Sequence, residues 1–447
     1  MTNKNCFIFK SCRYEPEQAS LFLEYGYSSG QSFTEVITFP GGRTNFSTEE
    51  WQALDRLMKA LHLAAGISYY KAFCPETIII ENQSLSQTEA DFFYKFYLLG
   101  LGEFSVENDL DLRKVINFPV SDRPTPKPGP LKLPKMNVVP IGGGKDSLVS
   151  LEILRHSQQA FRPIAINAGR PILEVIKAAE CSDAILISRK IDPALFRLNE
   201  QEAFNGHVPI TGILSFIMAF GTVIYGYDTV VMSNEQSANE GNMVRNDLAI
   251  NHQYSKSFEF EQDFSRFINR FILKNFRYFS LLRPLSESGI AALFSRKPDY
   301  FSSFKSCNRN FHISEGMRQY GWCCDCPKCR FVFLALAPFI GKEGMMKIFG
   351  HDMLGDARQK KGFEELLGIS GHKPFECVGE IGECRLLLKS LSLIPEWQDS
   401  LLVSQLAPEI DQAGLSLPEL AARSLEKYPG HQLPVEFERM LDEFIGY

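Results

Sequence analysis

The first forty residues alternate between apolar and polar positions with a period of two, which is the pattern of half-buried β-strands. The alternation runs through residues 6–9, 20–25 and 33–39 and predicts an antiparallel meander. A helix is expected to follow, from the capping box of Ser47 and Glu50 to about Leu63. Its expected core face consists of Trp51, Leu54, Leu57, Met58 and Leu61.

The pattern changes after a proline-rich segment. Residues 119–134 contain six prolines, and such a sequence neither continues a helix nor enters a sheet. Beyond it, short apolar runs alternate with helical stretches, which predicts an α/β fold with a parallel sheet covered by helices on both faces. The expected strands are residues 137–141, 163–167, 184–188, 229–232 and 279–282.

These changes divide the chain into four predicted parts. Residues 1–118 form an N-terminal α+β domain, and residues 119–135 form a proline-rich linker. Residues 136–290 form the parallel-sheet domain, and residues 291–447 form a cysteine-containing, mainly helical C-terminal region. A chain of 447 residues is long enough for two or three hydrophobic cores.

A glycine-rich turn follows the first strand of the parallel-sheet domain. It spans residues 142–147, with the sequence Gly-Gly-Gly-Lys-Asp-Ser, and precedes a helix. A Walker A loop would need glycine at Val139 and a hydroxyl residue at Asp146, and a dinucleotide fingerprint would need a third glycine at Asp146 or Ser147, so both are excluded. Backbone N–H groups at a helix N-terminus still predict a phosphate site, with an ordinary strand-to-helix turn as the alternative.

Charge and composition restrict the class of partner. The formal net charge of −6 argues against a nucleic-acid partner and favours a small-molecule substrate. The chain has no apolar signal region and no run of about 18–20 apolar residues, so we expect a cytoplasmic protein without a membrane partner. Eleven cysteines, scattered outside one cluster, favour reduced thiols over a disulfide framework. The oligomeric state stays open.

Two polar segments lie near the expected strand ends. Residues 233–242 are polar or small, a composition that suits a binding loop, although a solvated surface loop is the alternative. Residues 205–212 open a very apolar helix. His207 in this segment is either a general acid/base or a cap of that helix.

The cysteine cluster has the spacing of a metal site. Cys323, Cys326 and Cys329 form a Cys-x-x-Cys-x-x-Cys pattern, and Cys307 can supply a fourth thiolate. Four thiolates at such turns suit a closed tetrahedral Zn²⁺ site. Cys324 is then a bystander, although its pairing with Cys326 is a competing arrangement. A set of reduced, unligated thiols is the alternative to any metal.

Several of these segments resemble known enzymes. Residues 142–147 resemble the Ser-Gly-Gly-x-Asp-Ser signature of the PP-loop ATP pyrophosphatases, with Gly142 in place of the first serine. The cysteine cluster and residues 283–290 resemble the cyano-deazaguanine synthase branch of that superfamily, in which four cysteines bind zinc. Together with residues 205–211, 233–242 and 373–380, they are similar to the MurL family of UDP-N-acetylmuramoyl-L-alanyl-L-glutamate epimerases.

This resemblance implies a PP-loop (adenine nucleotide α-hydrolase-like) sheet domain and an ATP-dependent epimerase of peptidoglycan precursor synthesis. The terminal L-Glu of UDP-MurNAc-L-Ala-L-Glu becomes D-Glu, ATP gives AMP and pyrophosphate, and Mg²⁺ is required. Adenylation fits an epimerase, because a hydrogen beside an ionised carboxylate is a very weak acid. An adenylated carboxyl removes that charge, so an ordinary side-chain base can take the proton.

The resemblance also implies roles for particular residues. The loop binds the pyrophosphate unit with Lys145 pointing outward, Asp146 helps to hold Mg²⁺, and Asn167 meets the adenosine. The expected ATP-binding residues are Gly142, Gly143, Gly144, Lys145, Asp146, Ser147 and Asn167. The candidates for proton transfer are His207, Glu235, Glu240, Cys377 and Glu380, with Cys377 and Cys384 as a conceivable thiol pair. The candidates for substrate binding are Arg43, Asn234, Asn239, Asn242 and Arg245.

Three other functions compete with this hypothesis. A PP-loop ligase or nitrile-forming enzyme would adenylate a carboxylate and then admit ammonia, but no N-terminal cysteine nucleophile follows Met1. A tRNA-modifying PP-loop enzyme is disfavoured by the acidic net charge. A zinc-stabilised binding module without catalytic activity leaves the glycine loop without a purpose.

Overall fold

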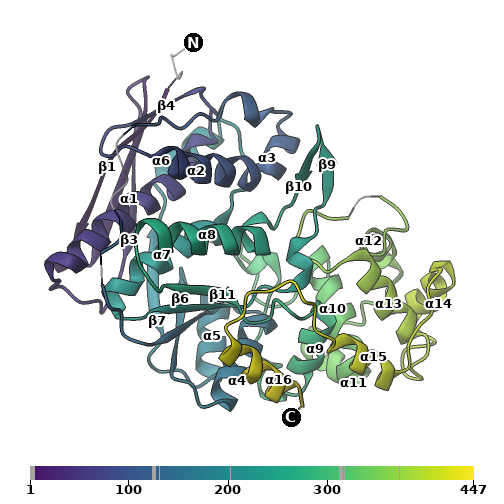
Figure 1. Ribbon diagram of the computed structural model, residues 1–447. Helices are drawn as coiled ribbons and strands as arrows, with labels where there is room; N and C mark the ends of the chain where they lie inside the picture. The colour runs from purple at the N-terminus through teal and green to yellow at the C-terminus, as the bar shows by residue number, and fades with distance from the viewer. Residues whose placement is uncertain are drawn as a thin grey trace. The chain divides into compact units, whose positions relative to one another are not determined.

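The computed structural model describes residues 6–446 except 123–126, 130, 202, 312–315, 317 and 372 (Figure 1). The strands are β1 (Cys6–Glu15), β2 (Ser20–Tyr27), β3 (Ser32–Thr38), β4 (Thr77–Ile80), β5 (Asn137–Pro140), β6 (Phe161–Ile166), β7 (Ile185–Lys190), β8 (Thr229–Met232), β9 (Met243–Arg245), β10 (Leu248–Ile250) and β11 (Arg277–Ser280). The α-helices are α1 (Thr48–Tyr70), α2 (Gln87–Gly100), α3 (Gly102–Glu107), α4 (Lys145–His156), α5 (Arg170–Ala178), α6 (Pro193–Asn199), α7 (Ile210–Tyr225), α8 (Phe258–Phe271), α9 (Glu287–Ser295), α10 (Pro327–Ile340), α11 (Lys342–Phe349), α12 (Lys360–Leu366), α13 (Ile381–Leu391), α14 (Leu401–Leu406), α15 (Leu417–Ser424) and α16 (Val435–Gly446).

The predicted α/β class and both strand patterns are confirmed. Within the described residues the main sheet has the order β11-β8-β5-β6-β7-β3-β2-β1-β4, and β9 and β10 form a separate hairpin. β1, β2 and β3 pair antiparallel, as the meander prediction requires, and β3 pairs antiparallel with β7. β5 and β8 pair in parallel. All five strands predicted after the proline-rich segment are present, with small shifts at their ends.

Helix α1 begins where the sequence predicts and ends later. Ser47 and Glu50 form the expected capping box. The helix continues to Tyr70. Its second half is buried on every side, so the sequence there has no apolar stripe from which the end of the helix could be predicted. The backbone of Gly66 approaches β1 closely, since a Cβ there would lie 2.3 Å from Cε1 of Phe9.

One expected core position of α1 is wrong. Trp51 is 39% exposed and packs in the first turn against Phe46, at 5.5 Å between ring centroids. Met58 is half-buried, whereas Leu54, Leu57 and Leu61 are buried as predicted. A helical period gives the direction in which a side chain points. It does not ensure that another part of the protein covers the first turn of the helix.

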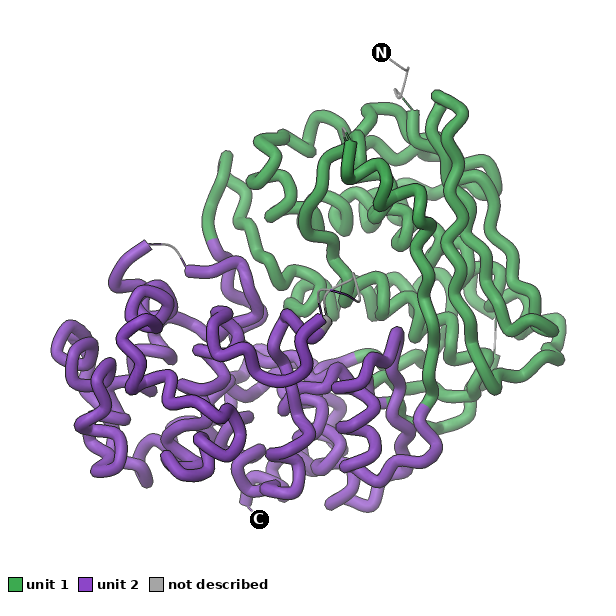
Figure 2. The backbone as a smooth tube through the Cα atoms, turned by 180° about the vertical axis from the view of Figure 1, so that it is seen from behind, with its two compact units in different colours: residues 1–138, 185–230, 243–278 green, residues 139–184, 231–242, 279–447 purple. Residues whose placement is uncertain are grey.

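The described residues divide into two compact units, each built from three stretches of chain (Figure 2). Unit 1 contains residues 1–138, 185–230 and 243–278, and unit 2 contains residues 139–184, 231–242 and 279–447. These units group residues by their contacts, so the domain boundaries expected from the sequence stay a prediction. The described part of the proline-rich segment 119–135 holds no helix or strand beyond an isolated bridge of Val120 to Leu85.

Unit 1 carries a buried ion pair between strands β3 and β7. The Arg189 guanidinium donates to both carboxylate oxygens of Glu35, at 2.7 Å from Nε and 3.1 Å from Nη2, and also to the Ser68 hydroxyl. The two side chains are 4% and 0% exposed. This two-point geometry fixes the register between β3 and β7.

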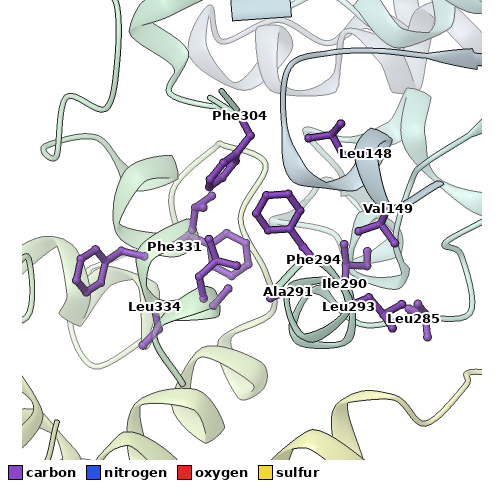
Figure 3. Close-up of a cluster of buried hydrophobic side chains, with 14 of the residues drawn as sticks. Leu148, Val149, Leu285, Ile290, Ala291, Leu293, Phe294, Phe304, Phe331 and Leu334 are labelled. Atoms are coloured by element: carbon purple, nitrogen blue, oxygen red, sulfur yellow. The ribbon is translucent and has the colours of Figure 1, made fainter. Parts of the chain in front are cut away.

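Unit 2 has its own hydrophobic core, made by α4, α9, α10 and the helices that follow (Figure 3). Phe294 of α9 packs edge-on against Phe304, with 4.6 Å between ring centroids. Helix α10 is buried along most of its length, and Ala337 in it accepts a hydrogen bond from the Trp397 indole at 3.1 Å. Among the described residues, no helix combines the length and the apolar character that a bilayer crossing needs.

Candidate functional site

The glycine loop has the predicted strand, turn and helix arrangement. β5 ends at Pro140, Gly143 adopts a left-handed φ of +87°, and Gly144 caps α4. Lys305 closes the turn from outside, because its backbone N–H donates to the Gly143 carbonyl at 2.8 Å. The space beside Gly142 is open, since a Cβ there would meet no atom within 4 Å. The first turn of α4 therefore offers N–H groups at a helix N-terminus, the geometry that favours an anion.

The prediction that Lys145 points outward is wrong. Lys145 is 3% exposed, and its ammonium contacts carboxylate oxygens of Asp146 and Glu287. Burial by itself lowers the pKa of Lys145, but the two carboxylates outweigh burial and raise it. Burial raises the pKa of Glu287, although the positive charge of Lys145 acts to lower it. Glu287, 142 positions along the chain, supplies an inward partner that no local pattern reveals.

The loop after β8 is half buried and half exposed. Asn234, Glu235 and Ser237 are buried, so the alternative of a solvated surface loop is wrong for this part. Asn234 donates from Nδ2 to the Ser280 hydroxyl at 3.0 Å. The buried Arg283 guanidinium donates to the Glu235 carbonyl at 2.6 Å. Polar side chains at the ends of β8 and β11 therefore hold one another in place.

The exposed half of that loop meets another segment that the sequence singled out. Glu240 forms an ion pair with Lys373, at 2.5 Å between Oε2 and Nζ. The Asn242 amide lies 3.5 Å from the Pro374 carbonyl, and Asn239 lies in the short helical turn before Glu240. Residues 233–242 and 373–380, which are far apart in the sequence, are therefore neighbours within unit 2.

Glu380 and the cysteines near it have different environments. Burial raises the pKa of Glu380, and the charges of Glu240 and Glu383 raise it further. Glu380 and Glu383 line a cavity of about 240 Å³. Cys384 is fully buried, and burial raises its pKa. Cys377 is half-buried, and its carbonyl accepts a hydrogen bond from Lys328.

Three predicted residues belong to unit 1, where each already has partners. Arg43 pairs with Glu50, at 2.6 Å between Nη2 and Oε1, and donates to the Val223 carbonyl. Arg245 donates to the Ser105 carbonyl at 2.8 Å and contacts Asp109. Both guanidinium groups are therefore already engaged by acceptors of unit 1.

His207 is the third, and it sits beside a second histidine. Its ring centroid lies 4.5 Å from that of His252, and both rings direct Nδ1 toward Oε2 of Glu103. Burial lowers the pKa of His207 to about 4, and repulsion from His252 contributes. His207 lies three residues before α7 rather than at its N-cap, which is Pro209. His252 and Glu103 form no local motif with His207, because both are remote from it along the chain.

Asn167 follows the end of β6 in the expected place. It has a left-handed φ of 55° and is exposed. The residues after it form α5, capped by Gly169. Asn167 therefore lies at the carboxyl end of a strand, where α/β sheets bind ligands.

The four predicted cysteines converge. The sulfur atoms of Cys307, Cys323, Cys326 and Cys329 lie within 4.8 Å of one another, with 4.0 Å from Cys307 to Cys326 and 3.7 Å from Cys323 to Cys329. A tetrahedral Zn²⁺ with sulfur at ~2.3 Å requires sulfur separations of about 3.8 Å. The backbone N–H of Cys329 also donates to the Cys326 sulfur at 3.4 Å.

Cys324 lies outside this group. Its sulfur contacts the Trp322 and Phe349 carbonyls instead, and burial raises its pKa to about 11. Cys324 is not among the four converging sulfur atoms, and this arrangement favours the bystander prediction over the competing pairing with Cys326.

A spacious cavity in unit 1 does not coincide with these sites. It measures about 550 Å³ and is formed in unit 1 by α1, α2, α8 and the turn after β4. None of the predicted site residues lines it. Size alone is a weak guide here, because the predicted site residues lie elsewhere.

Comparison with known proteins decides the family. A sequence profile of the MurL N-terminal domain matches residues 1–281, and one of the MurL C-terminal domain matches residues 303–419. The chain belongs to the MurL family. The resemblance predicted from the glycine loop, the polar segments and the cysteines is confirmed.

Curated members of the MurL family match almost the whole chain. A relative from Xanthomonas oryzae pv. oryzae is 38% identical over 96% of this chain and 95% of its own length. A relative from Salinispora tropica is 38% identical over 95% and 93% of the two chains. A third, from Micromonospora sp., is 37% identical over 98% of both. Each of the three is named UDP-N-acetyl-alpha-D-muramoyl-L-alanyl-L-glutamate epimerase.

Proposed function

We propose that this MurL-family protein is an epimerase that inverts the terminal L-Glu of UDP-MurNAc-L-Ala-L-Glu to D-Glu. The observation that carries the proposal is the match to three epimerases of that name over nearly the full length of each chain. Inversion of a glutamate α-carbon requires loss of a proton from one face and its return to the other. The substrate is then a nucleotide-sugar dipeptide of peptidoglycan precursor synthesis.

ATP is the second substrate in this proposal. The glycine loop and the N-terminus of α4 support binding of the β- and γ-phosphates in the manner of a PP-loop domain. The glutamate carboxylate attacks the α-phosphorus of ATP, so that a carboxyl–AMP anhydride forms and pyrophosphate leaves. After inversion, water cleaves the anhydride to D-Glu and AMP.

Mg²⁺ fits the oxygen donors near the loop. Asp146 is partly exposed, contacts Lys145 through Oδ1 and lies in the first turn of α4, and a carboxylate is the kind of ligand that a hard cation bound to phosphate prefers. When bound, Mg²⁺ supplies charge neutralisation of the phosphates. Lys145 then has a positioning role, because it orients the Asp146 carboxylate from the buried side.

Glu380 is the candidate base that its environment supports best. A carboxylate with a raised pKa is a stronger base than an ordinary glutamate, and Glu380 lines a cavity. Cys384 fits poorly as a partner base because it is fully buried. Glu235 is also buried, and Glu240 is occupied by Lys373.

The four-cysteine cluster fits a structural Zn²⁺. All four positions of a tetrahedral ion would be filled by thiolates, which leaves no position for substrate. Bound Zn²⁺ would link the loop at Cys307 to the start of α10 and so stabilise unit 2. It has no part in the reaction steps.

A direct assay tests the proposal. The protein is incubated with UDP-MurNAc-L-Ala-L-Glu, ATP and Mg²⁺, and the glutamate released by acid hydrolysis is resolved on a chiral column while AMP is measured. We expect D-Glu and AMP to appear together, and neither without ATP. D-Glu without ATP would refute adenylation and leave the epimerase, whereas AMP with an ammonia-dependent amide or nitrile product would favour the ligase alternative.

A further inference from the structure

Unit 1 contains a cluster of two imidazoles and a carboxylate that no part of the proposed reaction uses. Glu103 comes from the first turn of α3, His207 from the loop before α7, and His252 from the segment after β10. One ligand atom from each lies within 4.8 Å of the other two. Three separate parts of the chain therefore direct these groups to one point.

His252 and Glu103 form a hydrogen-bonded pair, and His207 lies beside that pair at a longer distance. Nδ1 of His252 contacts Oε2 of Glu103, and Nδ1 of His207 lies 3.6 Å from the same oxygen. A distance of 3.6 Å is too long for a hydrogen bond. Two ligand atoms at ~2.1 Å from one ion, at angles near 90–110°, lie about 3.0–3.5 Å apart, which is close to this spacing.

The carboxylates near the two histidines favour a cation, against the positive charge of Lys256, which also reaches His207. Glu103 is 7% exposed, and in the described part of the chain its ion-pair partners are the two histidines. A second carboxylate, that of Glu107, lies beside Gly206, where its Oε2 would be 2.8 Å from an added Cβ. Lys71, which lies in the same unit, donates to Asn205 rather than to these carboxylates. A buried carboxylate without a lysine or arginine partner is costly unless another positive charge is present.

We infer that Glu103, His207 and His252 form a binding site for a divalent transition-metal ion of the Zn²⁺ class, separate from the cysteine cluster. Two imidazole nitrogens and one carboxylate oxygen suit a borderline ion better than Mg²⁺, which prefers oxygen ligands. The histidine side chains are 20% and 16% exposed, so the ion keeps coordination positions open to water or to an anionic group. Three protein ligands with an open position distinguish this site from the closed four-thiolate cluster.

Gly206 supports the placement of His207. Its φ is +146°, a conformation that side-chain-bearing residues rarely adopt, and Glu107 fills the place of a Cβ. The residue before His207 must therefore be glycine for the imidazole to reach this point.

Anomalous scattering on wild-type crystals soaked in ZnCl₂ tests the site without any substitution. We expect an anomalous difference peak about 2.1 Å from Nδ1 of both histidines and from a Glu103 oxygen. A peak at the cysteines alone, or none near the histidines, overturns the inference. This measurement does not depend on turnover, so it succeeds or fails separately from the proposed epimerase.

Metal stoichiometry provides a second test in solution. Co²⁺ is titrated into metal-free protein, since thiolate-bound Co²⁺ has an intense sulfur-to-metal absorption that a nitrogen- and oxygen-bound ion lacks. We expect His252→Gln and Glu103→Gln to lose one bound equivalent while the sulfur band stays unchanged. The matched control is His351→Gln, which removes a histidine from a single carboxylate contact with Asp356 at 2.9 Å and leaves the stoichiometry unchanged. Full Co²⁺ binding by the folded His252→Gln protein contradicts the site.

Discussion

The buried contact of Lys145 with two carboxylates makes a quantitative prediction about stability. Replacement Lys145→Met removes one positive charge and leaves Asp146 and Glu287 without it. Lys145 and Glu287 are 3% and 1% exposed, and removal of one partner from a buried ion pair costs about 3–5 kcal/mol. Glu287→Gln leaves Lys145 its contact with Asp146, so the expected loss is smaller, about 1–3 kcal/mol.

Urea unfolding at fixed pH measures both losses. The matched control is Lys347→Met, which breaks an exposed pair with Glu343 in which the side chains are 74% and 85% exposed. Water screens such an exposed pair between neighbouring helical turns, so it contributes little to stability. If Lys145→Met costs no more than Lys347→Met, or less than Glu287→Gln, the assignment of Lys145 as the shared buried cation is refuted.

The same variant has a pH dependence with a definite sign. Burial raises the pKa of Glu287 in the folded protein, and loss of Lys145 removes the charge that opposes this rise. A carboxyl whose folded pKa lies above its unfolded value contributes most to stability at low pH and less as the pH increases. The destabilisation by Lys145→Met is therefore expected to be larger at pH 8 than at pH 5.5, and a constant difference contradicts this reading.

Three further predictions follow from single residues. The pKa of Glu380 is raised, so if Glu380 is the base, kcat/KM should fall on the acid side at a pH above the ordinary glutamate range. Glu380→Gln should abolish inversion. An unchanged rate of inversion in this variant excludes Glu380 as the base. Gly143→Ala places a side chain at a φ of +87°, so it should lower the free energy of unfolding by about 1–2 kcal/mol and weaken ATP binding. Gly142→Ala adds its methyl group to open space and should do neither. Equal effects of the two substitutions contradict the loop geometry. Burial lowers the pKa of His62 to about 4, so stability should fall by about 3 kcal/mol between pH 6.5 and pH 4 as the unfolded chain binds the proton, and His62→Gln should flatten that slope in acid unfolding.

The sequence predicted the strands well because each is a short apolar run with clear turn residues on both sides. The meander β1–β3 and five later strands, β5, β6, β7, β8 and β11, were found in this way, whereas β4, β9 and β10 were not predicted. The end of α1 was missed because residues 64–70 are buried on all sides and show no apolar stripe. Exposure of Trp51 was missed because periodicity gives the direction of a side chain and not the extent of the surface opposite it.

Residues of the site were predictable only where the chemistry is local. The glycine loop and the Cys323–Cys329 spacing are contiguous patterns, and the structure gives both the expected geometry. The inward direction of Lys145 depends on Glu287, and the contact of Glu240 depends on Lys373, 133 positions away. Such long-range partners leave no periodic or motif signal. Their identification requires the folded chain.

The measurement that tests the central proposal most directly is epimerisation in deuterium oxide, with AMP counted against D-Glu. Adenylation followed by proton exchange predicts one AMP for each D-Glu formed and deuterium at the α-carbon of the D-Glu product. D-Glu that retains the original hydrogen, or that forms in excess of AMP, would contradict inversion through an adenylated carboxyl.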